Sequence, residues 1–321
     1  EQEFDGAAYA KRGVILVTIN YRLNVYGFLA HPWLDEESGR GISGNYGILD
    51  QIAALQWVSD HIAAFGGDPG NITIFGQSAG AMSVQTLLSS ELTGNKIAKA
   101  ILQSGGSYRV GVHRDMSLRE AEEYGERFVE LTGAKDLAGL RAMSTQKLEK
   151  PLGQMMAEAF TSGKGLFFVP NIDGHVLKQG YNATIEEKKL KHIPYLLGST
   201  KNDIMVTKEQ LAAGEKGTLY EGCMAFSHKM EELWAEPSHV YYFSRQMPGD
   251  EEGAFHSAEL WYVFGTVKRC WRPLTEADVQ LSERMLDYWT NFMKKGDPNG
   301  DGLPQWRECS AADPFVMEFD V

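Results

Sequence analysis

Apolar residues recur along the chain with two different periods, and the two periods alternate. Short, continuous apolar runs, which are typical of buried strands, occur at residues 14–19, 71–75, 98–103, 195–198 and 239–243. Longer stretches with apolar residues at three- and four-residue steps, which predict helices, occur at 45–64, 79–88 and 276–294. Strands that alternate with helices favour βαβ units. The pattern therefore predicts an α/β fold with a mostly parallel sheet flanked by helices.

The middle of the chain departs from this alternation. Residues 118–131 and 137–143 are amphipathic and rich in Glu, Arg and Lys, which is typical of surface helices. We therefore expect a helical insertion over about 107–190. Because α/β proteins of 321 residues often form one domain, we expect the insertion to belong to a single domain over 1–321.

Composition narrows the classes of partner. The chain is 43% apolar with a net charge of −12, which argues against nucleic acid or an anionic membrane as the main partner. No apolar run approaches the roughly 18 residues of a membrane-spanning helix. Cys223, Cys270 and Cys309 are few and widely spaced. Their pattern favours free thiols over one disulfide, and hence a cytoplasmic location.

Ser78 lies in a Gly-x-Ser-x-Gly run at 76–80. In a chain with 34 glycines such a run also occurs by chance, but here an apolar strand precedes it and a helix follows. That order predicts a nucleophile elbow, a tight strand–turn–helix that exposes the serine. Gly76 and Gly80 must then lack side chains where strand and helix cross. The amide of Ala79 becomes an oxyanion donor.

The serine run belongs to a longer signature. Residues 65–80 are Phe-Gly-Gly-Asp-Pro-Gly-Asn-Ile-Thr-Ile-Phe-Gly-Gln-Ser-Ala-Gly. This sequence resembles the signature of type-B carboxylesterases, the group that includes cholinesterases and bacterial p-nitrobenzyl esterases. Further segments similar to that family lie at 20–23, 44–51, 102–105 and 296–299. The resemblance implies an α/β-hydrolase fold, no cofactor, and hydrolysis of a small-molecule carboxylic ester through an acyl-enzyme.

The base that a serine nucleophile needs is usually histidine near neutral pH. Among eight histidines, His256 lies in a segment at 253–265. That segment is similar to the family's Phe/Met-His-x-x-Glu-Leu…Phe-Gly stretch, which carries the catalytic histidine. The resemblance therefore implies that His256 is the base. The alternative is an ordinary polar loop residue.

The acid should fall between the serine and the histidine, on a loop after a strand. Residues 202–204 are Asn-Asp-Ile and follow the apolar run at 195–198. The family has Asp-Glu-Gly at this point, with the Glu in the triad, so Asp203 takes the place of the catalytic Glu. Aspartate is one methylene shorter, so its loop must approach the histidine more closely. Asp173 and Asp250 stay open as rival acids.

Two residues beside these positions are candidates for supporting roles. Ser104 follows the apolar run at 98–103 and resembles a buried family serine near the acid. Gln77 precedes the nucleophile, where many relatives have glutamate. A glutamine there removes one negative charge, which weakens any preference for cationic substrates. The alternative is that both side chains only pack.

One part of the family pattern is absent. The second oxyanion amide usually comes from a His-Gly-Gly loop after the third strand, and this sequence has no His-Gly-Gly. In the family that loop lies just upstream of the segment similar to residues 3–6. We therefore expect the chain to lack the first strands of the sheet, and its partner to be the missing N-terminal segment of the same protein. The alternative function is a catalytically impaired fragment or a non-catalytic binding protein on this fold.

A calcium-loop pattern at 297–308 competes with the family pattern. Its oxygen side chains stand at the loop positions of an EF-hand, with glycine at the sixth. No helix is expected after it, and two prolines stiffen it. The family carries a similar Gly-Asp-Pro-Asn…Trp loop here without metal, so we expect no metal. Aromatic candidates for the substrate pocket, most of which could equally be ordinary core residues, are Phe160, Phe167, Phe168, Trp261 and Phe264.

Overall fold

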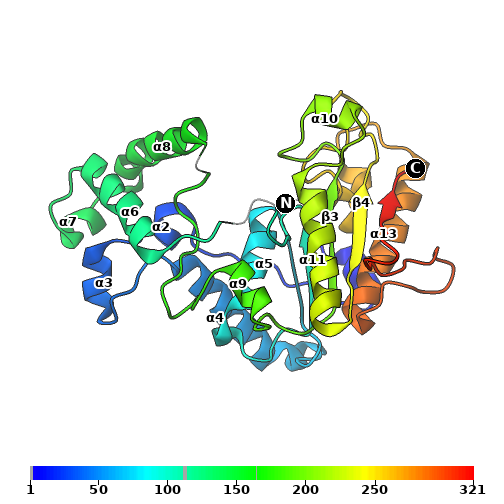
Figure 1. Cartoon of the computed structure of the whole chain (residues 1–321), viewed down its shortest axis with the longest axis horizontal. Coiled ribbons are helices and arrows are strands. Elements are labelled where there is room, and N and C mark those ends of the chain that lie inside the picture. The colour runs from blue at the N-terminus through cyan, green and yellow to red at the C-terminus, as the bar shows by residue number, and fades with distance from the viewer. Residues whose placement is uncertain (1–2, 111–113, 164) are drawn as a thin grey trace.

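A parallel five-stranded sheet forms the centre of the computed structural model, which describes residues 3–110, 114–163 and 165–321 (Figure 1). Its strands are β1 (Thr73–Gln77), β2 (Lys99–Gln103), β3 (Tyr195–Thr200), β4 (His239–Phe243) and β5 (Met317–Phe319), in the order β1-β2-β3-β4-β5. Every neighbouring pair is parallel. The predicted α/β class is confirmed. β5 was not predicted, because three residues carry no period.

Helices cover both faces of the sheet, and side chains alternate between two cores. Leu102 and Leu197 point to the face covered by α4 (Tyr46–His61), α5 (Ala79–Ser89), α9 (Tyr181–Glu186) and α11 (Thr218–Trp234). Ile101 and Leu196 point to the opposite face, covered by α1 (Ala7–Lys11), α12 (Leu260–Val263) and α13 (Glu276–Lys295). This burial on both sides explains why the central strands are continuous apolar runs.

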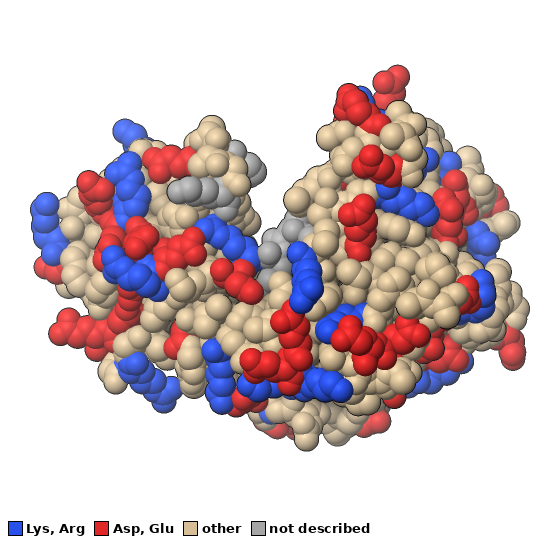
Figure 2. Space-filling model, viewed as in Figure 1, with Lys and Arg blue, Asp and Glu red and all other residues tan. Residues whose placement is uncertain are grey.

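A second group of helices stands apart from the sheet (Figure 1). It contains α2 (Asn24–Phe28), α3 (Pro32–Ser38), α6 (Leu118–Thr132), α7 (Leu137–Arg141) and α8 (Thr145–Ser162). Val25 and Leu29 join Phe128 and Met155 in its core. The predicted insertion therefore packs against a much earlier segment. α8 was not predicted, and it contains Pro151. Figure 2 shows a notch between this group and the sheet, with acidic and basic side chains intermixed on both sides.

The predicted strand at 14–19 is wrong. These residues are extended but form no strand, and Ile15, Val17 and Ile19 are each at least 40% exposed. A strand requires a hydrogen-bonded neighbour, and no described residue pairs with the backbone of 15–19. Val14 and Leu16 pack against the core beside α13, which holds the segment in place.

The remaining elements are short. They are α10 (Lys208–Ala212) and three 3-10 helices at Ile62–Phe65, Glu91–Thr93 and Val267–Arg269. Cys223, Cys270 and Cys309 are free thiols, as predicted, and the first and last are buried. Within the described residues, no helix has both the length and the apolar character required to cross a bilayer.

Candidate active site

Ser78 occupies a strained turn between β1 and α5. Its φ of 57° and ψ of −122° lie in a region that L residues rarely adopt, and such strain is typical of functional sites. The Ser78 N–H donates to the Gln103 carbonyl at 2.8 Å, which ties the turn to β2. A Cβ on Gly105 would lie 2.6 Å from the Ser78 carbonyl oxygen. The turn therefore depends on a glycine in the neighbouring loop as well as on its own.

The two glycines of the elbow differ. A Cβ on Gly76 would lie 2.4 Å from the Gly80 carbonyl carbon, so Gly76 must lack a side chain, as predicted. The same prediction for Gly80 is wrong, because a Cβ there meets no described atom within 4 Å. Gly80 instead lines a groove beside β1. The strand and helix were expected to crowd Gly80, but the space beside its Cα is open.

Ala79 is the first residue of α5. Amides in the first turn of a helix have no intrahelical acceptor, and the helix dipole favours negative charge at this end. The Ala79 N–H directly follows Ser78 in the chain, and the helix leaves its donor capacity unused. This is the arrangement that an oxyanion donor needs.

Asp203 and His256 come together at the carboxyl ends of β3 and β4. Nδ1 of His256 lies 2.5 Å from Oδ1 of Asp203, and the Asp203 side chain is 3% exposed. Asn202 fastens the two loops: its N–H donates to the Ala254 carbonyl and its Oδ1 accepts the Ala254 N–H, both at 2.9 Å. These interlocked loops bring the shorter aspartate within reach of the imidazole.

The Asp203 carboxylate accepts three more hydrogen bonds. Ser104 Oγ donates to Oδ2 at 2.7 Å, the Thr200 N–H donates to Oδ2 at 3.0 Å, and the Ile204 N–H donates to Oδ1 at 2.9 Å. Ser104 is fully buried and has a φ of 49°. Ser104, the serine predicted to have a supporting role, therefore lies against Asp203, and the carboxylate is fixed in orientation on both oxygens.

The hydrogen-bond partners of the His256 imidazole favour one tautomer. Burial lowers its pKa, but the hydrogen bond and charge of Asp203 outweigh burial and raise the pKa above its ordinary value. Gln77 Nε2 lies 3.2 Å from His256 Nε2. An amide nitrogen only donates, so Nε2 accepts and the proton resides on Nδ1, facing Asp203. Among the described residues, Ser78 Oγ has no hydrogen bond to His256.

The rival acids have other partners. Asp173 Oδ1 accepts the N–H groups of residues 175–177. Asp250 forms an ion pair with Arg272 at 2.6 Å. Neither contacts His256, so the geometry favours Asp203 over both.

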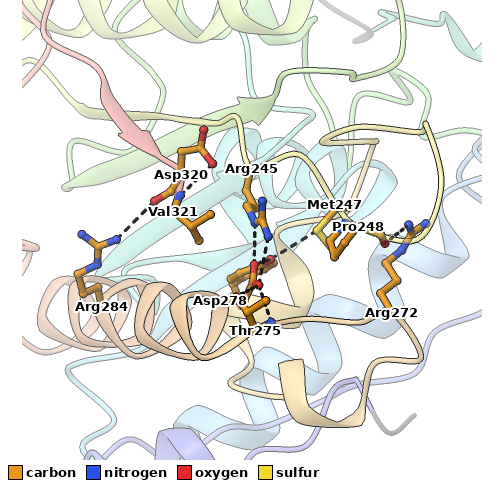
Figure 3. Close-up of polar contacts among 10 residues, drawn as sticks. Arg245, Met247, Pro248, Arg272, Thr275, Asp278, Arg284, Asp320 and Val321 are labelled. Atoms are coloured by element: carbon orange, nitrogen blue, oxygen red, sulfur yellow. Dashed lines mark hydrogen bonds and ion pairs between the residues drawn. The ribbon is translucent and has the colours of Figure 1, made fainter.

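A buried cluster anchors the segment that carries His256 (Figure 3). Asp278 at the start of α13 accepts from Arg245 at 2.7 Å and 3.2 Å, and from the Tyr262 hydroxyl at 2.7 Å. Arg245 precedes His256 and Tyr262 follows it, so both ends of the segment meet at one carboxylate. Burial opposes ionisation, but these bonds and those from Thr275 hold the pKa of Asp278 well below its usual range.

The oxygen side chains of the calcium-loop pattern accept hydrogen bonds within the loop. Asp297 Oδ1 accepts from the N–H and Nδ2 of Asn299, and Asn299 Oδ1 accepts the Trp306 N–H at 2.7 Å. These oxygens thus brace the loop. No group of three or more potential metal ligands occurs within the described parts of the chain.

The aromatic pocket candidates fall mainly in the cores. Phe167 is buried in the core of the separate helical group, and Phe168 packs at its edge. Phe264 is buried beside α13, and Trp261 is partly buried there. The Phe160 side chain lies outside the described residues. Sequence reasoning missed Asn202, which carries no pattern of its own, and Glu259, which stood in the histidine segment without a role.

Comparison with known proteins shows which family this chain resembles. The model of the Carboxylesterase family matches residues 1–222 and 215–321. The para-nitrobenzyl esterase of Bacillus subtilis is 31% identical, over 100% of this chain and 73% of that protein. Fumonisin B1 esterase of Sphingopyxis macrogoltabida is 30% identical, over 94% of this chain and 63% of that protein. This chain therefore spans about two thirds of the length of such relatives.

Solved structures agree with the sequence relatives. A thermophilic p-nitrobenzyl esterase superposes with a TM-score of 0.83 and 28% identity, over 99% of this chain and 72% of that one. A carboxylesterase of Geobacillus stearothermophilus gives a TM-score of 0.80 and 29% identity, over 99% and 74%. The fold is thus the α/β-hydrolase fold, and the chain belongs to the Carboxylesterase family.

Proposed function

We propose that this chain carries the catalytic centre of a serine hydrolase that cleaves carboxylic esters through an acyl-enzyme. The observation that carries the proposal is the contact between buried Asp203 and half-buried His256, with Nδ1 2.5 Å from the carboxylate, at the end of the sheet where the strained Ser78 turn lies. Such a pair supplies a base for the serine hydroxyl. Membership of the Carboxylesterase family supports the same chemistry.

The first half of the reaction transfers the acyl group. Ser78 Oγ replaces Gln77 as the partner of His256 Nε2 and attacks the ester carbonyl carbon as Nε2 takes its proton. The amide of Ala79 donates to the oxyanion of the tetrahedral intermediate. Collapse breaks the bond to the alcohol, which leaves with the proton from Nε2, and the acyl group stays on Ser78.

The second half regenerates the enzyme. Water attacks the acyl carbon while His256 accepts its proton, and collapse releases the carboxylic acid as Ser78 Oγ takes that proton back. Asp203 stays ionised throughout, because its carboxylate stabilises the imidazolium that forms in each half. The substrate class that this centre requires is a small-molecule carboxylic ester.

Hydrolysis of p-nitrophenyl acetate by the full-length protein tests the proposal. Wild-type protein should release nitrophenol and Ser78→Ala should not, with a loss in kcat on the order of 10⁶. Ser83→Ala is a matched control, since Ser83 lies on α5 and bonds Gln51. Equal rates for wild type and Ser78→Ala would overturn the proposal and favour a non-catalytic binding protein.

We further propose that another strand of the same protein completes the sheet beside β1. The Ile72 carbonyl and the Ser78 N–H bond to the β2 side, each at 2.8 Å. Backbone groups of a strand alternate sides, so those of Thr73, Phe75 and Gln77 face the other way. Among the described residues they have no backbone partner there. An unpaired edge of this kind is a template for one more strand.

The groove beside this edge supports the same proposal. It has a volume of about 450 Å³, with residues 14–19 on one side and β1 on the other. Ile15, Val17, Ile74 and Phe75 line it, so its walls are apolar. A parallel strand seated there would end near Ser78, where the loop after it would supply the second oxyanion donor. The occupant we propose is the N-terminal segment expected from the sequence.

Hydrogen exchange tests this second proposal. In a longer form of the protein that includes the N-terminal segment, the amides of Phe75 and Gln77 should exchange slowly. In the 321-residue chain they should exchange fast, and kcat should be lower by about 10²–10³, the cost of one lost oxyanion donor. Equal protection and equal kcat in the two forms would contradict it.

A further inference from the structure

A second buried carboxyl group lies beside the proposed triad. Glu259 stands three residues after His256, directly before α12, and its side chain is completely buried. The acyl-transfer steps described above do not use it. Burying a carboxyl group without an ion-pair partner is costly for a fold. The position of Glu259 beside the proposed catalytic histidine therefore needs a physical explanation.

Glu259 connects the histidine segment to the sheet. Its Oε1 accepts from Gln103 Nε2 at 3.3 Å and from the Tyr241 hydroxyl at 3.2 Å. Gln103 ends β2, and its carbonyl accepts the Ser78 N–H at 2.8 Å. Glu259, three residues after His256, is therefore one hydrogen bond from Gln103, the residue that holds the Ser78 turn. The contact spans β2 and β4, the strands on either side of β3.

The second oxygen of Glu259 is unsatisfied. Oε2 is buried and has no hydrogen-bond partner among the described residues. Buried carboxylate oxygens normally accept hydrogen bonds. Oε1 alone is hydrogen-bonded, so one half of the carboxyl group has no donor and the charges of its neighbours bear strongly on its ionisation.

The neighbours of Glu259 couple its charge to that of the base. The titratable groups that face it are Asp203 from the loop after β3, Tyr241 from β4 and His256 from its own segment. Burial, and then the negative charge of Asp203, raise the pKa of Glu259 to about 7, while His256 acts in the opposite direction. In return, the Glu259 charge raises the pKa of His256. Ionised Glu259 and protonated His256 thus favour each other.

We propose that Glu259 is a positioning residue of the catalytic centre: it ties the His256 segment to β2 and β4, and its buried carboxyl stabilises the positive charge that His256 gains in each proton transfer. This inference rests on the proposed ester hydrolysis by Ser78 and His256. It adds a second carboxyl group that acts through the imidazole without touching the substrate.

The test compares Glu259→Gln with wild type in the full-length protein, using p-nitrophenyl acetate across pH. Glutamine keeps the size and the Oε1 acceptor but removes the charge. We expect kcat to fall on the order of tenfold, the lower end of the loss seen when a group that orients a metal-bound histidine is removed, with KM within about twofold. The acid limb of kcat/KM should move to lower pH by on the order of half a unit, because His256 loses a negative neighbour.

Glu252→Gln is the matched control, since it removes the same charge from an exposed position on the same segment. It should leave kcat and the acid limb unchanged, because solvent screens exposed charges. An unchanged pH profile and kcat in Glu259→Gln, with only a shift in melting temperature, would reduce Glu259 to a structural role and overturn the inference.

A second variant keeps the inference testable if Glu259→Gln does not fold. Glu259→Asp retains the charge, so its acid limb should stay at the wild-type pH even where kcat falls. A displaced acid limb in that variant would overturn the inference. Ser78→Ala in the same assay separates the two hypotheses: hydrolysis that survives it refutes the proposed function, whereas an unaltered Glu259→Gln refutes only the role of Glu259.

Discussion

The two sides of Ser78 differ in how completely the chain surrounds them. Toward β3 and β4, Asp203 is held by Ser104, and Asn202 fastens the loops through two hydrogen bonds. Toward residues 14–19, the outer edge of β1 is unpaired and borders a groove of about 450 Å³. This chain itself therefore fixes the proposed acid and base, Asp203 and His256. In our proposal, the outer side of Ser78 is completed by the strand that fills the groove.

The largest expected effect is on the closed side. Asp203→Asn should lower kcat/KM for p-nitrophenyl acetate on the order of 10⁴, because an amide no longer stabilises the imidazolium or fixes its tautomer. Asp173→Asn serves as the control and should change kcat/KM less than about threefold, since Asp173 only caps a turn. Similar losses in the two variants would show that Asp203 is not the acid.

The two elbow glycines compare a packed position and an open position of the nucleophile turn. Gly76→Ala should destabilise the 321-residue chain by about 3 kcal/mol, because the new methyl group meets the Gly80 backbone. Gly80→Ala should be neutral or stabilising by up to about 1 kcal/mol, since alanine favours a helix and the space is empty. Urea unfolding of both variants measures this. A Gly80→Ala variant as unstable as Gly76→Ala would mean that the groove is not open.

An effect of similar size, which depends on pH, concerns the anchor of the histidine segment. Asp278→Asn leaves Arg245 without its buried partner and should cost about 3 kcal/mol at neutral pH. The pKa of Asp278 is lowered in the folded state, so its contribution is present above the unfolded pKa of about 4. The contribution is lost as pH falls through the folded pKa.

Urea unfolding of wild type and Asp278→Asn at several pH values checks this. The stability difference should be constant from pH 7 to about 5 and should narrow below about 4. A difference that instead grows toward low pH would contradict the assignment of the lowered pKa.

Sequence reasoning found the elements whose signal is local. The run at 239–243 became β4 with the same bounds, and the helix expected at 276–294 is α13 (Glu276–Lys295). The run at 14–19 failed because strand formation depends on a neighbour, which no local pattern reports. α11 (Thr218–Trp234) was missed. It contains Gly222, which weakens a helix pattern, and the need for glycine there comes from the close approach of Val110, which lies far away in the sequence.

In the candidate site too, residues with a local motif could be predicted, whereas contacts between distant loops could not. Motif and chain order predicted Ser78, Asp203 and His256 as the triad, and the structure brings Asp203 and His256 together. The contact of Gln77 with His256 and the fastening by Asn202 follow from loop geometry, which one-dimensional spacing does not contain. Glu259 was visible in the histidine segment. Its burial, which gives it a role, appears only in three dimensions.

Covalent labelling of Ser78 tests the central claim most directly. The full-length protein would be treated with a fluorophosphonate probe, digested, and mapped by mass spectrometry. We predict one adduct on Ser78, abolished in Ser78→Ala and strongly slowed in His256→Ala, because the hydroxyl reacts only when its base is present. An adduct on another serine, or none in a protein that hydrolyses p-nitrophenyl acetate, would contradict the account.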